Sequence, residues 1–148
     1  MSFMMVEKEF KLVGLKGSGE FVNYGDEVPL LAKQLLSRSR EIQNSTETEI
    51  ALFEPKKDEE HRIGDYYVGL IVSEKLNEVP TGMVYIEINK RYITTRGNIL
   101  NLGELHLNLL NWAEEQGYQR NLDSYIIETY HPMGEGFEEV KVYLPIQA

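Results

Sequence analysis

Two segments of the chain carry apolar residues at the spacing of an amphipathic helix. In the first, about residues 26–42, apolar side chains recur at i, i+3, i+4, i+7 and i+8, which places them on one face. Asp26 is predicted to cap the start of this helix. The second helix is predicted between Asn101, as its cap, and Gly117, as its C-terminal stop. Each helix therefore has one apolar face available to cover a sheet.

Six further segments have the β-branched, aromatic or alternating composition of strands. They cover about residues 6–16, 49–55, 65–73, 83–96, 124–131 and 139–146. The glycines Gly14, Gly17 and Gly19 are expected to end the first strand, and the fourth strand is expected to bend near Asn89. The order strand, helix, strand, strand therefore occurs twice along the chain.

This repeated order predicts an α+β fold built from a duplicated βαββ unit. The halves are about residues 1–78 and 79–148, and they are expected to form a single domain. Weak similarities between the halves, at offsets of about 75 to 80 residues, agree with a duplication. Two such units are expected to join their strands in an antiparallel sheet with two helices, and to leave a ligand cleft between the pseudo-symmetric halves.

Composition limits the classes of function. The chain has 148 residues, no cysteine and a net charge of −9. The lack of cysteine excludes disulfides, thiolate metal sites and cysteine nucleophiles, and it agrees with a cytoplasmic location. The acidic charge disfavours direct nucleic-acid binding. The chain has no apolar run of about 20 residues that would span a membrane, and no signal peptide is recognised at its start.

Glu128 is the leading candidate for a functional polar side chain. In the strand predicted over residues 124–131, alternation places it on one face with Ile126 and Tyr130. A carboxylate between apolar neighbours is costly to bury without a partner, which suggests a group that receives a cationic ligand or acts as a general base. The alternative is an edge-strand glutamate that faces water.

Aromatic residues form the second candidate set. Tyr67, Tyr85, Trp112 and Tyr130 all fall inside predicted elements. Rings around one acid would bind planar or cationic compounds by stacking and cation–π contacts. The alternative interpretation of each ring is as part of the hydrophobic core.

The histidines indicate no metal centre. His61, His106 and His131 are too scattered in sequence to form a recognised ligand set, and no cofactor-binding motif accompanies them. His106 lies on the apolar stripe of the second helix, so it is interpreted as a core or boundary histidine. The glycine-rich string at residues 14–20 lacks the spacing of a nucleotide-binding fingerprint.

Several sequence phrases follow one another in the order found in one known family. They are YYVGLIVSE at 66–74, VPTGM at 79–83, KRYITTRG at 90–97, NWAEEQGY at 111–118, IIETYHP at 126–132 and VKVYLPI at 140–146. Together they resemble the gyrase-inhibitor-like (GyrI-like) small-molecule-binding family, which includes the effector-binding domains of AraC-type and MerR-type multidrug regulators. The resemblance covers nearly the whole chain and is strongest from Tyr66 onward.

The resemblance implies a cleft in which a glutamate of the penultimate strand, followed two residues later by a tyrosine, contacts the ligand. In this chain that pair is Glu128 and Tyr130. The aromatic walls vary within the family, so Tyr67, Trp112 and Tyr85 are carried over more loosely. Regulators of this kind have a helix-turn-helix before the effector domain. Since this chain begins at the first strand, it is expected to be the stand-alone form.

The resemblance implies alternative functions. The first is binding of small hydrophobic or cationic aromatic compounds in an acidic, aromatic-lined cleft, with a response passed to a separate regulator. The second is hydrolysis of cyclopropane-bearing genotoxic compounds, with Glu128 positioning or activating water, so enzymatic activity is left open. The third is a gyrase-inhibitor-like interaction with a partner such as DNA gyrase, which no specific sequence feature supports. No cofactor is expected for any of them.

Overall fold

The computed structural model describes residues 2–134 and 136–147, and its elements follow the order βαββ twice. The strands are β1 (Met4–Glu20), β2 (Ser45–Phe53), β3 (Ile63–Val72), β4 (Val84–Asn98), β5 (Ile126–Gly134) and β6 (Phe137–Pro145). The helices are α1 (Tyr24–Ser37) and α2 (Leu102–Gln116), with short 3-10 turns η1 (Phe21–Asn23), η2 (Ser39–Glu41) and η3 (Ile99–Asn101). This order confirms the α+β class and the duplicated unit. Neither described helix is long and apolar enough to cross a membrane.

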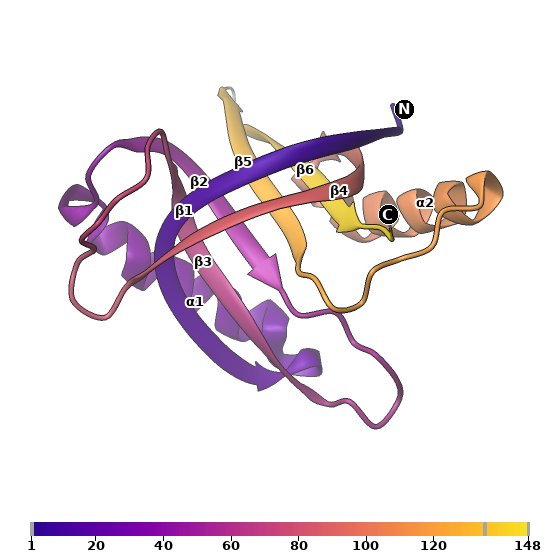
Figure 1. Ribbon diagram of the computed structural model, residues 1–148, viewed down its shortest axis with the longest axis horizontal. Coiled ribbons are helices and arrows are strands. Elements are labelled where there is room, and N and C mark those ends of the chain that lie inside the picture. Colours follow the sequence, from indigo (N-terminus) through magenta and orange to yellow (C-terminus); the bar gives the residue numbers. More distant parts are fainter. Residues whose placement is uncertain (1, 135, 148) are drawn as a thin grey trace.

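The described strands form one antiparallel sheet that closes on itself in the order β1-β3-β2-β5-β6-β4. The pairs β2–β5 and β1–β4 join the two halves. Figure 1 shows the long, curved β1 running beside β4 and then beside β3, so that one strand completes the closure. The sequence pattern predicts the sheet but not its closure, because closure depends on β1 being long enough to pair on both sides.

β1 continues through Gly14, Gly17 and Gly19, whereas the sequence analysis expected the strand to end there. Gly14 lies opposite Gly69 of β3, and a Cβ atom at either position would collide with the backbone of the other strand. These two glycines therefore allow a close approach of β1 and β3 within a continuous ladder. β4 likewise continues past Asn89 and pairs with β1 without interruption there, so the strand is not broken at this position.

The helix ends differ from expectation in how they are capped. α1 begins before Asp26, which lies in its first turn and is not the N-cap. Asn101 does precede α2, but its side chain makes no capping hydrogen bond. Instead, the Asn98 side chain accepts a hydrogen bond of 2.9 Å from the Leu100 N–H at the start of η3. Gly117 ends α2 in the left-handed conformation (φ 78°), as predicted.

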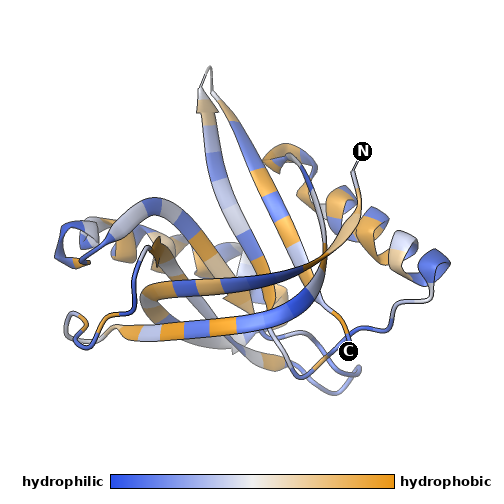
Figure 2. Cartoon of the chain, turned by 45° about the horizontal axis from the view of Figure 1, so that its top comes forward, coloured by the Kyte–Doolittle hydropathy of each residue, from blue (hydrophilic) through white to orange (hydrophobic). Residues whose placement is uncertain are grey.

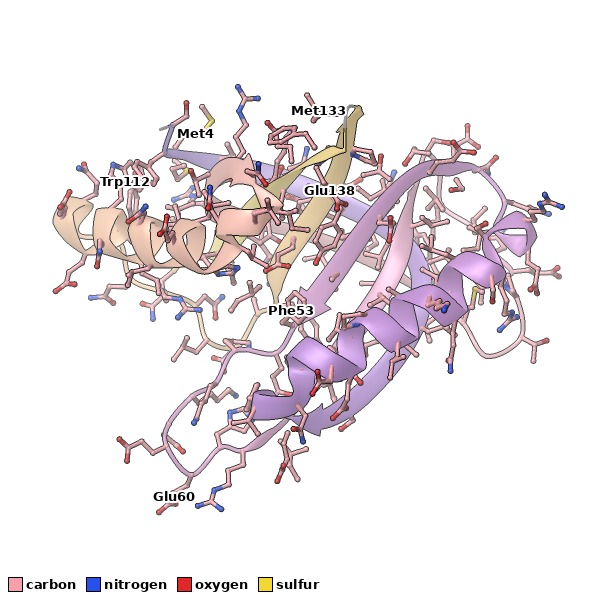
Figure 3. All side chains as sticks on the ribbon, turned by 180° about the vertical axis from the view of Figure 1, so that it is seen from behind. Met4, Phe53, Glu60, Trp112, Met133 and Glu138 are labelled. Atoms are coloured by element: carbon pink, nitrogen blue, oxygen red, sulfur yellow. The ribbon has the colours of Figure 1, made fainter. Side chains whose placement is uncertain are left out.

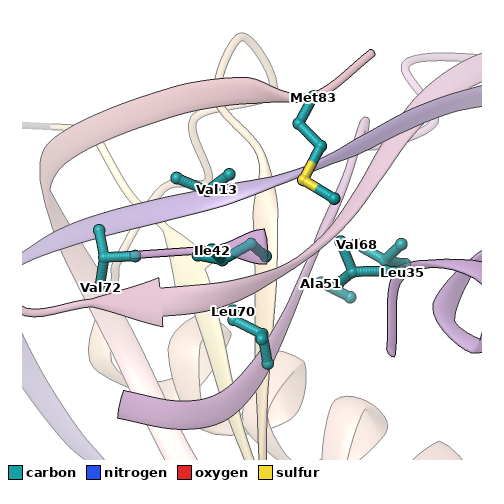
Figure 4. Packing of buried hydrophobic residues seen from close by; sticks show 8 residues of the cluster. All are labelled: Val13, Leu35, Ile42, Ala51, Val68, Leu70, Val72 and Met83. Carbon is teal, nitrogen blue, oxygen red and sulfur yellow. The ribbon is translucent and has the colours of Figure 1, made fainter. Parts of the chain in front are cut away.

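Apolar side chains of the described residues gather in three clusters. One lies between α1 and the first half of the sheet (Figure 4), and the second lies between α2 and the second half. The third fills the barrel, where Phe10, Tyr92 and Tyr143 meet edge to face. Figure 2 shows the alternation of hydrophobic and hydrophilic residues along the long strands, which supplies clusters on both faces of the sheet.

The strand registers show which residues of the two halves are equivalent. β3 and β6 share a pattern of buried residues in which Val68 corresponds to Val142. Ala51 of β2 lies opposite Val68, and Glu128 of β5 lies opposite Val142. Ala51 and Glu128 are therefore equivalent, and they are also direct partners in the β2–β5 ladder. The pseudo-two-fold axis passes between them.

Candidate functional site

A cavity of about 450 Å³ lies between the two halves. Residues of α1, β2 and β3 form one side, and residues of η3, α2, β5 and β6 form the other. Figure 3 shows both helices in front of the sheet, with Phe53 of β2 and Glu138 of β6 between them. The expected cleft between the halves is therefore present, and its volume is in the range of small-molecule pockets.

Glu128 lies in the wall of this cavity, beside the pseudo-two-fold axis, and is only 5% exposed. Both of its carboxylate oxygens are engaged. The Tyr130 hydroxyl donates to Oε1 at 2.6 Å, and His106 Nε2 lies 2.7 Å from Oε2. Short hydrogen bonds to a charged group offset part of the hydration lost on burial. Glu128 is therefore a buried carboxylate and not a surface side chain.

Tyr130 is held in its protonated form. Burial, and then the adjacent Glu128 carboxylate, keep the pKa of the Tyr130 phenol well above its ordinary value. The phenol therefore remains a hydrogen-bond donor at physiological pH. His106 approaches the same carboxylate from α2, whereas Tyr130 belongs to β5. A helix and a strand thus fix the orientation of the glutamate together.

The polar groups of this arrangement come from the second half of the chain. Ala51 is the counterpart of the buried glutamate, and by the same register Phe53 is the counterpart of Tyr130. His106 is the fifth residue of α2, and the fifth residue of α1 is Val28. All three counterparts from the first half line the cavity. At these three positions the first half is therefore apolar where the second half is polar.

Two further carboxylates line the cavity, Glu49 of β2 and Glu138 of β6. Burial, and then the proximity of Glu138, raise the pKa of Glu49. No Lys or Arg of the described chain lines this cavity. Acidic groups without an opposing cation in a partly enclosed cleft produce a negative potential, and such a potential attracts cations. We call this site the acidic cleft.

Three more aromatic residues expected beside the glutamate, Tyr67, Tyr85 and Trp112, lie outside the lining of the acidic cleft. Trp112 stacks on Phe3 with the ring centroids 5.6 Å apart, on the side of α2 near the start of β1 (Figure 3). Tyr67 packs with the barrel interior and meets Tyr125 edge to face at 5.6 Å. Tyr85 packs against the cluster beneath α1. Tyr67 therefore lies on the barrel-facing side of the sheet, whereas Tyr85 lies on the α1-facing side but outside the cleft lining.

Tyr130 lines the cleft as predicted, but two other rings of the cleft were not predicted from the sequence. Tyr24 and Phe53 line it, with ring centroids 6.0 Å apart. Alternation along β2 was an available signal, since it places Glu49, Ala51 and Phe53 on one face. His106 was interpreted as a core or boundary histidine because of its apolar neighbours, and its contact with Glu128 was not predicted. A single polar residue inside an apolar helical stripe was the signal that could have identified it.

Comparisons by sequence assign no family. No family model matches the chain, and no curated protein matches it. Among residues 2–134 and 136–147, no group of three or more His, Cys, Asp and Glu side chains is arranged to hold a metal ion. Similarity to known proteins is therefore found at the level of structure.

Solved structures share the fold over almost the whole chain. The structure of SAV2435 bound to tetraphenylphosphonium matches with a TM-score of 0.71 at 8% identity, covering 100% of this chain and 95% of that chain. The EcmrR C-terminal domain matches with a TM-score of 0.61 at 13% identity, covering 99% of both chains. A hydrolase encoded by lin2189 from Listeria innocua matches with a TM-score of 0.60 at 10% identity, covering 98% and 91%. At these identities the similarity shows the fold alone, and it agrees with the GyrI-like fold expected from the sequence.

Proposed function

We propose that the protein binds lipophilic organic cations in the acidic cleft, with Glu128 as the group that recognises the positive charge. The observation that carries this proposal is a buried carboxylate in the wall of a largely apolar cavity. Glu49 and Glu138 add negative charge there, and no Lys or Arg of the described chain lines the cavity. A lipophilic cation suits both properties, because its charge meets the carboxylates while its apolar groups cover Phe53 and Val28.

Burial strengthens recognition by charge. Water is largely excluded around Glu128, so its attraction to a cation is screened less than it would be at the surface. The rings of Tyr24 and Phe53 offer cation–π contacts, each worth about 0.5–2 kcal/mol. A phosphonium or quaternary ammonium ion with apolar substituents loses less hydration on entry than a compact ammonium ion. The cleft therefore favours a diffuse charge over a compact one.

Tyr130 and His106 prepare the carboxylate for a ligand. Their hydrogen bonds hold Glu128 in one orientation before the ligand arrives, so less conformational entropy is lost on binding. Each carboxylate oxygen can accept more than one hydrogen bond or cationic contact. Glu128 can therefore keep both partners and still face a cation in the cavity. The shared fold with SAV2435 bound to tetraphenylphosphonium supports this choice of ligand class.

Titration calorimetry with tetraphenylphosphonium tests the proposal. We expect the wild type to bind it, and Glu128→Gln, which removes the charge at nearly constant size, to lose at least about tenfold in affinity. Glu115→Gln on the exposed surface of α2 makes the same change of charge, and its affinity is expected to stay within about twofold. Triphenylphosphine oxide, a neutral analogue, is expected to bind wild type and Glu128→Gln equally. Equal affinity of these two proteins for tetraphenylphosphonium would overturn the proposal.

A hydrolase is the second candidate, and the contact between Glu128 and His106 favours it. A carboxylate 2.7 Å from an imidazole is suited to general-base activation of water. The lin2189 protein, which shares the fold, is described as a hydrolase. The substrate class would be cyclopropane-bearing alkylating compounds, whose strained ring water would open. Mass spectrometry would then detect a product heavier by one water with wild type and none with Glu128→Gln. An unchanged compound after incubation with wild type would eliminate this candidate.

A further inference from the structure

A second cavity, of about 400 Å³, is lined by residues of β1, β4 and β6, and β6 is the strand that it shares with the acidic cleft. Alternation along β6 turns Val142 toward α2, and turns Lys141 and Tyr143 to the other face, where they line this cavity. Glu128 lies opposite Val142 in the β5–β6 ladder and so shares the face of Val142. The sheet therefore separates the two cavities, and the second does not depend on the function proposed for the first.

The second cavity has the opposite charge to the first. Its lining includes Lys8, Arg96 and Lys141, although the chain as a whole has a net charge of −9. Arg96 and Lys141 lie directly opposite each other in the β4–β6 ladder. Like charges at directly opposed positions destabilise a sheet. The fold alone therefore gives no reason for this pair, whereas an anion between the two side chains would.

These three cations form no ion pair with a carboxylate among residues 2–134 and 136–147. Glu7 is the one acid in the lining within that part of the chain, and Arg91 engages it at 3.2 Å. Glu139, the next outward-lying residue on the same face of β6, lies opposite His131. The lining therefore carries an excess of positive charge, with three cations and one acid that already pairs with Arg91.

The apolar residues of the remaining lining would contact the uncharged part of a ligand. Met4, Val6 and Tyr143 supply apolar surface next to the cations, and Met4 is 53% exposed. We propose that this cavity binds an anionic small molecule, with a carboxylate, sulfonate or phosphate carried on an apolar body. Arg96 and Lys141 donate charge-assisted hydrogen bonds to the anionic group, and the apolar residues cover the body. The planar guanidinium of Arg96 suits a two-point contact with such oxyanions.

Calorimetric titration with 1-naphthalenesulfonate tests this second site. We expect wild type to bind it, and a double variant, Arg96→Gln with Lys141→Gln, to lose at least about tenfold in affinity. The matched control is Lys16→Gln with Lys57→Gln, which changes the net charge equally at two cations that already pair with Asp65 and Asp123. Its affinity is expected to stay within about threefold, the range of a general electrostatic effect.

Two further readouts keep this test separate from that of the acidic cleft. Tetraphenylphosphonium affinity is expected to be unchanged by the Arg96 and Lys141 double variant, because the sheet lies between the two sites. The thermal stability of that variant is expected to equal or exceed that of wild type, since an unfavourable like-charge pair is removed. No detectable binding of 1-naphthalenesulfonate to wild type, or equal losses in the two double variants, would overturn the inference.

Discussion

Ala51 and Glu128 lie directly opposite each other in the ladder between β2 and β5, at equivalent positions of the two halves. The duplicated fold thus places an alanine and a glutamate together at the pseudo-two-fold axis. Two glutamates at these positions would set like charges directly opposite each other and destabilise the sheet. Alanine on one side avoids that repulsion and leaves space beside a single carboxylate. The departure from symmetry is therefore what creates the acidic cleft.

Tyr130→Phe tests whether the buried carboxylate depends on its donor. The substitution removes the hydroxyl that donates to Glu128 at 2.6 Å and leaves a buried oxygen without that partner. We expect the free energy of unfolding, measured by urea denaturation, to fall by about 1–3 kcal/mol. Tyr85→Phe removes an exposed hydrogen bond to Glu87, and its effect is expected to stay below about 0.5 kcal/mol. Similar losses in both variants would contradict a special environment at Tyr130.

Glu49 links stability to pH. Burial and Glu138 raise its pKa above the ordinary 4.5, so the folded protein holds this proton more tightly than the unfolded chain does. The ionised carboxylate therefore lowers stability at pH values above the raised pKa, and this loss vanishes below 4.5, where both states are protonated. We expect Glu49→Gln to be more stable than wild type at neutral pH and equal to it in acid.

Urea denaturation at a series of pH values measures this difference. Glu115→Gln, an exposed position on α2, is the control and is expected to show a small difference from wild type at every pH. The Glu49→Gln variant is expected to bind tetraphenylphosphonium more weakly than wild type does. The substitution would therefore raise stability and lower affinity. A stability gain of Glu49→Gln that increases as the pH falls has the wrong sign for this account.

Gly14→Ala tests the close approach of β1 and β3. The added methyl group would collide with the backbone carbonyl of Val68, so the strands must separate to accept it. We expect the free energy of unfolding to fall by at least about 2 kcal/mol. Gly103→Ala in α2 has open space around the new methyl group and is expected to raise stability by about 0.5–1 kcal/mol. A neutral Gly14→Ala variant would show that the strands have more room than the structure indicates.

The local sequence pattern was sufficient to predict the order of helices and strands, because each of these elements has its own spacing of hydrophobic residues. It failed at Gly14, where glycine serves a contact with Gly69 some 55 residues away and not a turn. It failed again at Asp26, since the start of α1 depends on how η1 leads out of β1. Closure of the sheet also lay beyond it, because pairing between distant strands has no local signature.

The residues of the candidate site were likewise predictable from the sequence only in part. Alternation along one strand placed Glu128 and Tyr130 on a common face, and the structure brings both to the acidic cleft. Contacts between elements could not be derived by that route. Which side of α2 meets β5 is set by packing, so the contact of His106 with Glu128 was not predicted, while Trp112 was expected at the cleft. Phe3, which covers Trp112, lies more than 100 residues away in sequence.

The position of a bound cation is the most direct measure of whether Glu128 recognises charge. A crystal structure of the complex with tetraphenylphosphonium is expected to place the phosphonium between α1 and β5, facing the Glu128 carboxylate. A phenyl ring is expected to lie against Phe53 on the apolar wall. An empty cleft at saturating ligand, or a cation held elsewhere on the surface, would contradict the account.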